Sequence, residues 1–328
     1  MNAPHFDALG TPIRRGHIDT PQVRLAYEDW GDPHAPPLLL IMGLGAQMLL
    51  WPDGFCRRLV EAGFRVIRYD NRDIGLSGRI RSLVPPPNLW WLIARAQLGM
   101  QSKVPYTLED MADDTAALLD GLGLEQAHVV GGSMGGMIAQ VFAGRYPARV
   151  ASLAVIFSST CQPFLPPTAP SLLWKLLRKP RPETGLHGQK AHVKALFQAL
   201  GSAAYPVDEA EMDALIDRLG ERGIDGGGAR RQLMALLGTG DLRRYAQRIQ
   251  ARTCVIHGAK DRMLPPAAGR AVARAILGAE FHLIAGMGHD LPRQLWPLLT
   301  RLIACNALPV TRDITVPDEH AVVARAAA

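Results

Sequence analysis

Cysteine is scarce in this chain, and its cysteines lie far apart in the sequence. Only four occur among 328 residues, and none forms a CxxC pair or another zinc-type spacing: Cys56, Cys161, Cys254 and Cys305. Neither a disulfide framework nor a zinc site is therefore expected. The first twenty residues lack the apolar core of a secretory signal. These absences predict a protein of the reducing cytoplasm.

Long apolar runs and a strong excess of one charge are also lacking. No uninterrupted apolar run approaches the roughly 18–20 residues that a membrane-spanning helix needs, so no membrane span is expected. The net charge of +6 arises from 36 basic and 30 acidic residues. The arginines are scattered, apart from a modest cluster at Arg178, Lys179 and Arg181. This charge is typical of a solvated surface, and no nucleic-acid partner is expected.

What the chain does contain is an alternation of short apolar runs with helical patterns. The helical patterns place apolar residues three and four positions apart, as in 108–122, and a further helix is expected to end before Pro147. Strands are expected at 37–42, 64–70, 127–132, 150–157, 253–258 and 281–286, and helices at 108–122, 134–145 and 267–277. Such an alternation predicts an α/β protein with a mostly parallel sheet that helices cover on both faces.

Two segments interrupt this alternation. Residues 79–106 carry a proline triplet and two adjacent tryptophans, and residues 159–245 are helical with prolines at their start and a glycine triplet at 226–228. We interpret the longer segment as an inserted helical cap. The expected division is a core at 1–158 with an excursion at 79–106, the cap at 159–245, a second core part at 246–304, and a tail at 305–328.

The stretch VVGGSMGGMIAQ, residues 129–140, places one serine among four glycines after an apolar strand. It lacks the lysine of a phosphate-binding Walker loop and does not match the dinucleotide fingerprint. It does match G-x-S-x-G, with Gly131, Ser133 and Gly135 between strand and helix. On such a sharp bend, larger residues two positions away would clash, and the serine hydroxyl would be exposed as a nucleophile. The alternative is a structural glycine turn without chemistry.

A nucleophilic serine needs a histidine base, which in this kind of sheet follows the acid in the chain. His289 stands just after an expected strand, in the small-residue loop GMGHDLP, and is our candidate base. His257 and His282 lie inside expected strands and are expected to be packing residues, whereas His320 lies in the tail.

The candidate acid is Asp261, at the end of the expected strand TCVIHGAKD. Asp70 and Asp73 precede the serine and fit the chain order less well. The other position that this arrangement allows, after the strand 150–157, holds Ser158, Ser159 and Thr160 and no carboxylate. Asp290 adjoins the histidine in sequence, so its side chain is expected to point elsewhere.

The transition state also needs an oxyanion hole made of backbone N–H groups. One donor is expected from Met134, the residue after the nucleophile, and the other from the turn at Gly43–Leu44. Apolar walls are expected from Leu44, Met134 and Leu264. The aromatic residues of the two interrupting segments either line a pocket or anchor the cap: Trp90, Trp91, Phe164, Trp174 and Tyr205.

These motifs resemble the α/β-hydrolase superfamily over residues 20–304. Besides GGSMGG, HGAKD and GMGHDLP, the stretch DNRDIGLS (70–77) is similar to the superfamily's D-x-R-G-x-G-x-S, with Asp73 in place of a glycine. IMGLGAQMLLWPDGF and IRYDNRDIGLSG resemble the esterase branch that includes aclacinomycin methylesterase. The resemblance implies the α/β-hydrolase fold, and it implies Leu44 as the second oxyanion donor. Met42 stands where most relatives have histidine.

A serine nucleophile argues against the dehalogenases and epoxide hydrolases of this fold, which use aspartate there. The sequence predicts a serine carboxylic-ester hydrolase that acts through an acyl-enzyme on a small to medium, largely apolar ester. No metal or organic cofactor is expected, and homo-oligomers stay open. The alternatives are a lactonase or a haloperoxidase-like perhydrolase with the same triad. A hydrolase scaffold that binds a ligand without catalysis is an alternative of another class.

Overall fold

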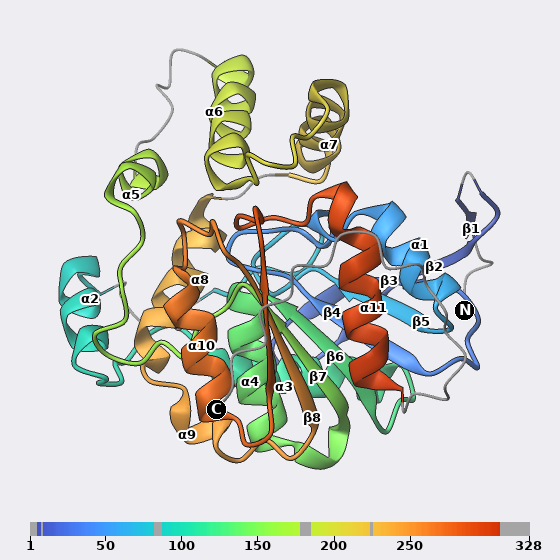
Figure 1. Ribbon diagram of the computed structural model, residues 1–328, viewed down its shortest axis with the longest axis horizontal. Coiled ribbons are helices and arrows are strands. Elements are labelled where there is room, and N and C mark those ends of the chain that lie inside the picture. The colour runs from blue at the N-terminus through green and yellow to red at the C-terminus, as the bar shows by residue number, and fades with distance from the viewer. Residues whose placement is uncertain (1–4, 8, 82–86, 178–184, 224–225, 309–328) are drawn as a thin grey trace.

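The computed structural model describes residues 5–7, 9–81, 87–177, 185–223 and 226–308. Within these residues, nine strands form one sheet in the order β1-β2-β3-β5-β4-β6-β7-β8-β9 (Figure 1). Strands β5 and β6 lie on opposite sides of β4, so the chain reverses its direction across the sheet at β4. Because the strands from β4 to β9 are parallel, their carboxyl ends lie at one edge, where ligands bind in open α/β sheets.

The parallel part of the sheet matches the strands expected from the apolar runs. It consists of β4 (Pro37–Ile41), β5 (Arg65–Tyr69), β6 (Ala127–Gly132), β7 (Val150–Ile156), β8 (Arg252–Gly258) and β9 (Glu280–Ile284). Neighbouring strands in this part pair in parallel. Leu38 to Ile41 are fully buried, as expected of a strand covered on both faces.

An antiparallel part precedes it, and the apolar runs did not predict it. It consists of β1 (His5–Phe6), β2 (Pro12–Asp19) and β3 (Arg24–Trp30), which pair antiparallel, and β3 continues antiparallel onto β5. The sequence of β2, PIRRGHID, has no apolar run because most of its side chains are partly or fully exposed. Such a strand could be recognised only by an alternation of apolar and polar residues, and β2 has too few apolar residues to show one.

Helices cover both faces of the sheet, as the alternation predicted. One face packs on α1 (Asp53–Glu61) and α11 (Trp296–Ala307), and the other on α3 (Leu108–Gly121), α4 (Met134–Arg145) and α10 (Pro266–Ala275). Helix α3 begins at a capping box in which Thr107 and Asp110 bond each other's backbone N–H groups. Among the described helices, none is long and apolar enough to cross a membrane.

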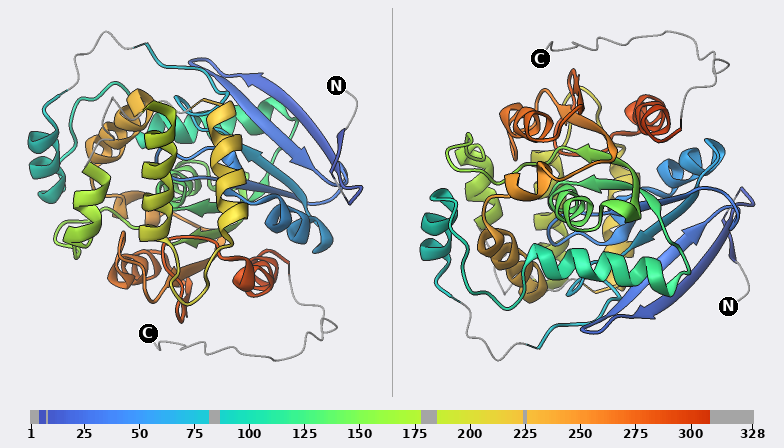
Figure 2. Two further views of the ribbon diagram at one scale, coloured as in Figure 1. Left: turned by 90° about the horizontal axis from the view of Figure 1, so that it is seen from above. Right: turned by 90° about the horizontal axis from the view of Figure 1, so that it is seen from below.

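Between β7 and β8, the described residues of the segment 159–245 form five further α-helices. They are α5 (Pro170–Leu177), α6 (Gly185–Leu200), α7 (Glu209–Glu221), α8 (Gly226–Thr239) and α9 (Arg243–Ala246). Figures 1 and 2 show α6 and α7 above the edge of the sheet where the parallel strands end. Helix α2 (Leu89–Gln97) lies in the segment 79–106 and packs on α8 through Leu92. Helix α11 continues to Ala307, and residues 309–328 lie outside the described residues.

Candidate active site

Ser133 sits on the turn between β6 and α4, with a strained backbone. Its φ of 55° and ψ of −123° lie in a region that side-chain-bearing residues rarely adopt. A Cβ on Gly131 would overlap the backbone of Gly135, and a Cβ on Gly135 would overlap the carbonyl oxygen of Ile41. The G-x-S-x-G spacing is therefore a steric requirement of this bend. Because these positions are glycine, the first turn of α4 can pack directly against the ends of β4 and β6.

The structure brings His289 and Asp261 to this serine. Nε2 of His289 lies 2.9 Å from Oγ of Ser133, and Nδ1 lies 2.7 Å from Oδ2 of Asp261. The other carboxylate oxygen of Asp261 accepts the backbone N–H groups of Met263 and Leu264 at 2.8 and 2.9 Å. With both oxygens accepting, Asp261 holds the proton of His289 on Nδ1. Nε2 is then free to accept the hydroxyl proton of Ser133.

The other histidines hold different positions. His257 is fully buried, and its Nε2–H donates to the carbonyl oxygen of Leu264 at 2.8 Å. Burial lowers the pKa of His257, so this imidazole is neutral and packs beneath Asp261. His282 is half-buried and lies 3.6 Å from Glu280. His320 lies outside the described residues.

The two earlier aspartates bind elsewhere. Asp70 accepts the N–H of Met48 at 2.8 Å and pairs with Arg222 at 2.5 Å, while Asp73 pairs with Arg231 through two bonds of 2.8 Å. Asp73 has a φ of 73°, which explains why glycine is usual at this position in the resembling motif. In this chain the carboxylate of Asp73 ties the loop 70–77 to helix α8.

The turn after β4 lies directly against the serine. A Cβ on Gly43 would stand 2.9 Å from Cβ of Ser133, so glycine permits this approach. Among the described residues, the N–H groups of Leu44 and Met134 have no acceptor. Two buried amides hold the turn: the Asn71 side chain donates to the carbonyl oxygen of Met42, and the Gln232 side chain accepts the N–H of Gly45, both at 2.8 Å.

The loop that carries His289 is bonded to the end of helix α6. The N–H of His289 donates to the carbonyl oxygen of Leu200 at 2.9 Å, and the N–H of Gly288 donates to Oγ of Ser202 at 2.7 Å. Ser202 in turn donates its hydroxyl and its N–H to the carboxylate of Asp290 at 2.5 and 3.1 Å. Burial raises the pKa of Asp290, although the bonds from Ser202 oppose the shift. The carboxylate of Asp290 is thus bonded to Ser202 and not to the ring of His289.

Sequence reasoning missed four residues around this site. Phe157 packs its ring 4.7 Å from the ring of His289, and Ser158 donates to the carbonyl oxygen of Ser133 at 2.7 Å. Their place directly after β7, on the same edge as Ser133, was the available signal. Gln232 and Ser202 lie far from the motifs in the chain, so no local pattern could have indicated them.

The expected wall residues fall into two groups. Met134 is buried, and Leu44 and Leu264 are partly buried against the core, close to the serine turn and to Asp261. The aromatic residues of the interrupting segments are different, because four of them are more than half exposed: Trp90, Trp91, Phe164 and Trp174. Tyr205 is half-buried and donates its hydroxyl to the carbonyl oxygen of Ala285 at 3.0 Å.

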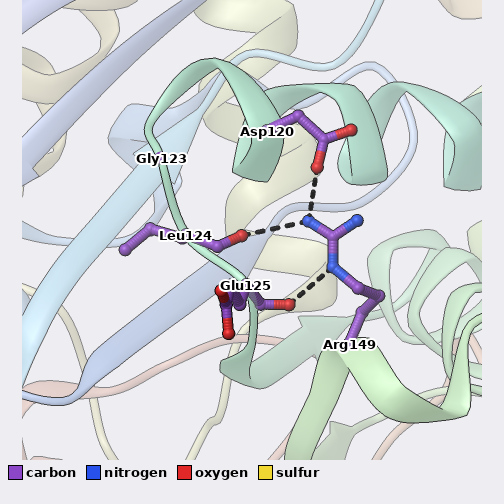
Figure 3. Close-up of a pocket in the computed structure, with 5 residues that line it drawn as sticks. All are labelled: Asp120, Gly123, Leu124, Glu125 and Arg149. Carbon is purple, nitrogen blue, oxygen red and sulfur yellow. Dashed lines mark hydrogen bonds and ion pairs between the residues drawn. The ribbon is translucent and has the colours of Figure 1, made fainter.

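A hollow of about 500 Å³ lies at the opposite edge of the sheet, where α3 ends and β7 begins (Figure 3). Arg149 spans it, donating to the carbonyl oxygens of Leu124 and Glu125 and to the carboxylate of Asp120. These bonds satisfy carbonyl groups just beyond the end of α3, so Arg149 has a structural role. In the described part of the chain, no three His, Cys, Asp or Glu side chains are arranged to hold a metal ion.

Comparison with known proteins agrees with this fold. A family model described as alpha/beta hydrolase fold matches residues 36–292. The chain belongs to the α/β-hydrolase fold family. The rhodomycin D methylesterase DnrP of Streptomyces peucetius is 29% identical over 320 residues, covering 90% of this chain and 98% of that protein. The poly(3-hydroxyalkanoate) depolymerase of Ectopseudomonas oleovorans is 28% identical over 275 residues, covering 83% and 84% of the two chains.

Solved structures show the same fold. The enol-lactonase of Burkholderia xenovorans LB400 matches with a TM-score of 0.65 at 23% identity, covering 89% of this chain and 99% of that one. A 2-hydroxy-6-oxo-6-phenylhexa-2,4-dienoate hydrolase from Rhodococcus sp. strain RHA1 matches with a TM-score of 0.68 at 19% identity, covering 90% and 99%. The expected fold and the likeness to the methylesterase branch are thus confirmed. The relatives support a carboxylic-ester hydrolase as the class of this α/β hydrolase.

Proposed function

We propose that the chain is a serine carboxylic-ester hydrolase in which Ser133 is the nucleophile, His289 the base and Asp261 the acid. The observation that carries the proposal is the unbroken chain of hydrogen bonds from Ser133 through His289 to Asp261, at 2.9 and 2.7 Å. Nucleophile and base are within direct reach, and a third group orients the base, which is the arrangement that activates a serine at neutral pH.

The reaction follows from this geometry. His289 accepts the hydroxyl proton at Nε2 while Oγ of Ser133 bonds to the ester carbonyl carbon. The imidazolium is stabilised by Asp261, and it then gives the proton to the departing alkoxide as the carbon–oxygen bond breaks. Water, losing its proton to the same Nε2, attacks the acyl-enzyme carbonyl carbon. The imidazolium then gives this proton to Oγ of Ser133 as the bond between Oγ and the acyl carbon breaks, which releases the acid. Protons and bonds balance without any further reagent.

The charge that develops on the carbonyl oxygen needs donors in place before the reaction. Gly43 lies against Ser133, and the N–H groups of the residues that follow these two, Leu44 and Met134, have no acceptor in the described part of the chain, which supports them as the oxyanion hole. The positive end of the α4 dipole adds to the same field. Losing one donor of this kind costs about 2.7–4 kcal/mol of transition-state stabilisation.

We further propose that residues 159–245 form a cap on a hydrolase core made of residues 1–158 and 246–304. The bonds from Ser202 and Gln232 to the two loops beside Ser133 support this division. The half-buried apolar side chains of Leu44 and Leu264 suit a small to medium, largely apolar ester. Because the relative matched along its whole length is named a methylesterase, methyl esters are the first substrates to test.

A cytoplasmic location belongs to the same proposal. The four cysteines are all free thiols, and Cys56 and Cys254 are buried. Burial raises the pKa of both thiols to about 12, so they are unreactive in the folded chain. Free, protected thiols fit a reducing compartment.

Labelling with a fluorophosphonate tests the nucleophile directly. The wild-type chain and Ser171→Ala, which alters an exposed serine of α5, are expected to be labelled, whereas Ser133→Ala is not. On p-nitrophenyl esters of graded length, methyl esters and lactones, Ser133→Ala should lose about 10⁶-fold in kcat. Lactones turned over faster than every ester would favour the lactonase alternative. Ligand binding without labelling or turnover in the wild-type chain would establish the non-catalytic scaffold instead.

A further inference from the structure

Large apolar side chains are exposed together along one edge of the molecule. Helix α2 and the loop after it expose Trp90 by 72%, Trp91 by 51%, Leu98 by 66% and Met100 by 43%. The segment that leads into α5 exposes Phe164 by 86%, and α5 exposes Trp174 by 61%. We call this set of six residues the aromatic edge. Globular chains seldom expose so many large apolar groups in one region without a function.

The two segments of the aromatic edge lie side by side. A Cβ on Gly99 would stand 3.2 Å from the Pro163 ring, which places the loop after α2 against the segment that carries Phe164. Figures 1 and 2 show α2 and α5 on the same side of the molecule. On α2, Leu92 faces inward on Val104 and Met234. The helix is therefore anchored by one face, while the tryptophans project to solvent.

The aromatic edge also lies next to the candidate active site. The N–H of Ala169 donates to the carbonyl oxygen of Arg262 at 2.9 Å, and Thr168 donates its hydroxyl to the carbonyl oxygen of Met263 at 2.8 Å. Arg262 and Met263 directly follow Asp261. The chain from Phe164 to α5 is thus fastened to the loop that carries the acid.

The two segments that carry the aromatic edge have charged side chains of one sign. Residues 74–108 and 126–182 contain no aspartate or glutamate. The same segments supply basic side chains that the structure shows exposed, at Arg81, Lys103 and Lys175. The guanidinium of Arg95 stacks on the ring of Trp91, 4.6 Å from its centroid. Asp241, whose Cβ would stand 3.9 Å from a Cβ on Gly99, pairs with Arg243. Acidic groups gather instead on α7, at Glu209, Glu211, Asp213 and Asp217.

We propose that the aromatic edge docks the protein on an anionic lipid–water surface. Tryptophan prefers the boundary between lipid headgroups and hydrocarbon, where its ring is buried and its N–H stays hydrated. Exposed basic residues on segments that contain no acidic residue add attraction to anionic headgroups. A polar protein partner would complement the charge but leave the tryptophans without an apolar environment. Docking in this way sets the Asp261 loop close to the surface where apolar esters accumulate.

Vesicle co-sedimentation of the full chain tests this inference. One set of vesicles holds phosphatidylcholine alone, and the other holds phosphatidylglycerol and phosphatidylcholine in equal parts. Binding should require phosphatidylglycerol and weaken as salt is raised, because exposed charges are screened. Tryptophan emission should shift to shorter wavelength when the vesicles bind.

Two variants separate the apolar and the charged contributions. Trp90→Ala with Trp91→Ala should weaken binding about tenfold or more, because two interfacial rings are lost. Lys103→Glu with Lys175→Glu should remove the preference for phosphatidylglycerol. The matched control is Leu277→Ala with Arg274→Glu, an exposed apolar and basic pair at the far end of α10, which should bind like the wild-type chain.

All variants should keep their melting temperature and their turnover of a small, freely dissolved ester, so this inference can fail while the proposed function stands. Equal binding by the wild-type chain and the Trp90/Trp91 variant, or no binding to either vesicle at low salt, would overturn it. A self-associated wild-type chain that the same two substitutions dissociate would assign the aromatic edge to a second copy instead.

Discussion

The serine and histidine sides of the candidate site are built by different means. Ser133 is positioned mainly by backbone, since the spacing of glycines at β6 and α4 shapes the bend, and the Ser158 hydroxyl adds a bond to its carbonyl oxygen. His289 stands on a loop whose neighbours are bonded to the end of α6, through Leu200 and Ser202. The serine side belongs to the sheet, and the histidine side belongs partly to the helices inserted above it.

Substitutions on the serine side and on the histidine side should therefore have different effects on stability and activity. A change on the serine side alters main-chain packing and so acts on the folding of the whole sheet. A change at the contacts of Ser202 should leave the sheet intact and disturb only the placement of His289. Stability and activity should therefore be coupled on one side and separable on the other.

Among the substitutions that compare the two sides, the largest effect is expected at Asp261, the candidate acid. Asp261→Asn should lower kcat by about 10⁴-fold, because a neutral amide no longer holds the proton of His289 on Nδ1. The matched control is Asp73→Asn, whose partner is Arg231 in α8. Steady-state kinetics on one ester should show the control within about tenfold of wild type. If Asp261→Asn were active and Asp73→Asn inactive, Asp73 and not Asp261 would be the acid.

The next largest effect is expected on the serine side, and in stability. Gly135→Ala should lower the free energy of unfolding by about 3 kcal/mol, because its Cβ would overlap the backbone of Ile41. Gly220→Ala is the control, since a Cβ there meets nothing within 4 Å; it should be neutral or stabilising by about 0.4–1 kcal/mol. Chemical denaturation measures both. Equal stability of the two variants would contradict a steric origin of the G-x-S-x-G spacing.

A smaller effect on stability, accompanied by a loss of activity, is expected at Ser202. Ser202→Ala leaves the N–H of Gly288 without its acceptor, and such a loss costs about 1–3 kcal/mol. We expect kcat to fall about tenfold or more with KM nearly unchanged, because the position of His289 matters to the chemical step. Ser202→Thr keeps the hydroxyl and should restore most of the rate. A melting temperature lowered as far as that of Gly135→Ala would show that the two sides are not separable.

The smallest effect is a dependence on pH at Asp290. Burial raises its pKa above the ordinary 3.8, so the ionised carboxylate is less favourable in the folded chain than in the unfolded one. This destabilising contribution is absent below 3.8 and grows as pH rises through the folded pKa. The melting temperature of Asp290→Asn relative to wild type should therefore increase from acidic to neutral pH. A difference that is constant or falls with pH would contradict the raised pKa.

The same division explains how far the sequence could predict the molecule. The serine side depends on residues close together in the chain, so GGSMGG and the strand before it were sufficient to predict the bend. His289 and Asp261 could be placed because each directly follows a strand of apolar residues, and the carboxyl ends of parallel strands meet at one edge. In the structure, Nε2 of His289 lies 2.9 Å from Oγ of Ser133 and Nδ1 lies 2.7 Å from Oδ2 of Asp261. The catalytic roles of the three residues stay a prediction.

The remainder depends on contacts between distant parts of the chain. Ser202 and Gln232 are ordinary polar residues in their local sequence, and only the docking of α6 and α8 gives them buried partners. The strands β1 to β3 were missed because their polar side chains hide the alternation. The tryptophans of α2 could not be assigned to core, pocket or surface, since aromatic residues serve all three. The structure shows that they face solvent.

The insertion between β7 and β8 also bears on how the chain folds and how it can be altered. In the sheet, Ala127 pairs with Val150 across 23 positions, whereas Ser152 pairs with Arg252 across one hundred. The entropy of closing a loop grows only with the logarithm of its length, so the longer connection costs about 1.3 kcal/mol more than the shorter one. The insertion should slow the formation of the sheet more than it lowers the stability of the sheet, because segments distant in the chain must meet before β7 and β8 can pair. The junction after β7 is therefore where this chain can be lengthened, shortened or exchanged at little thermodynamic cost to the sheet.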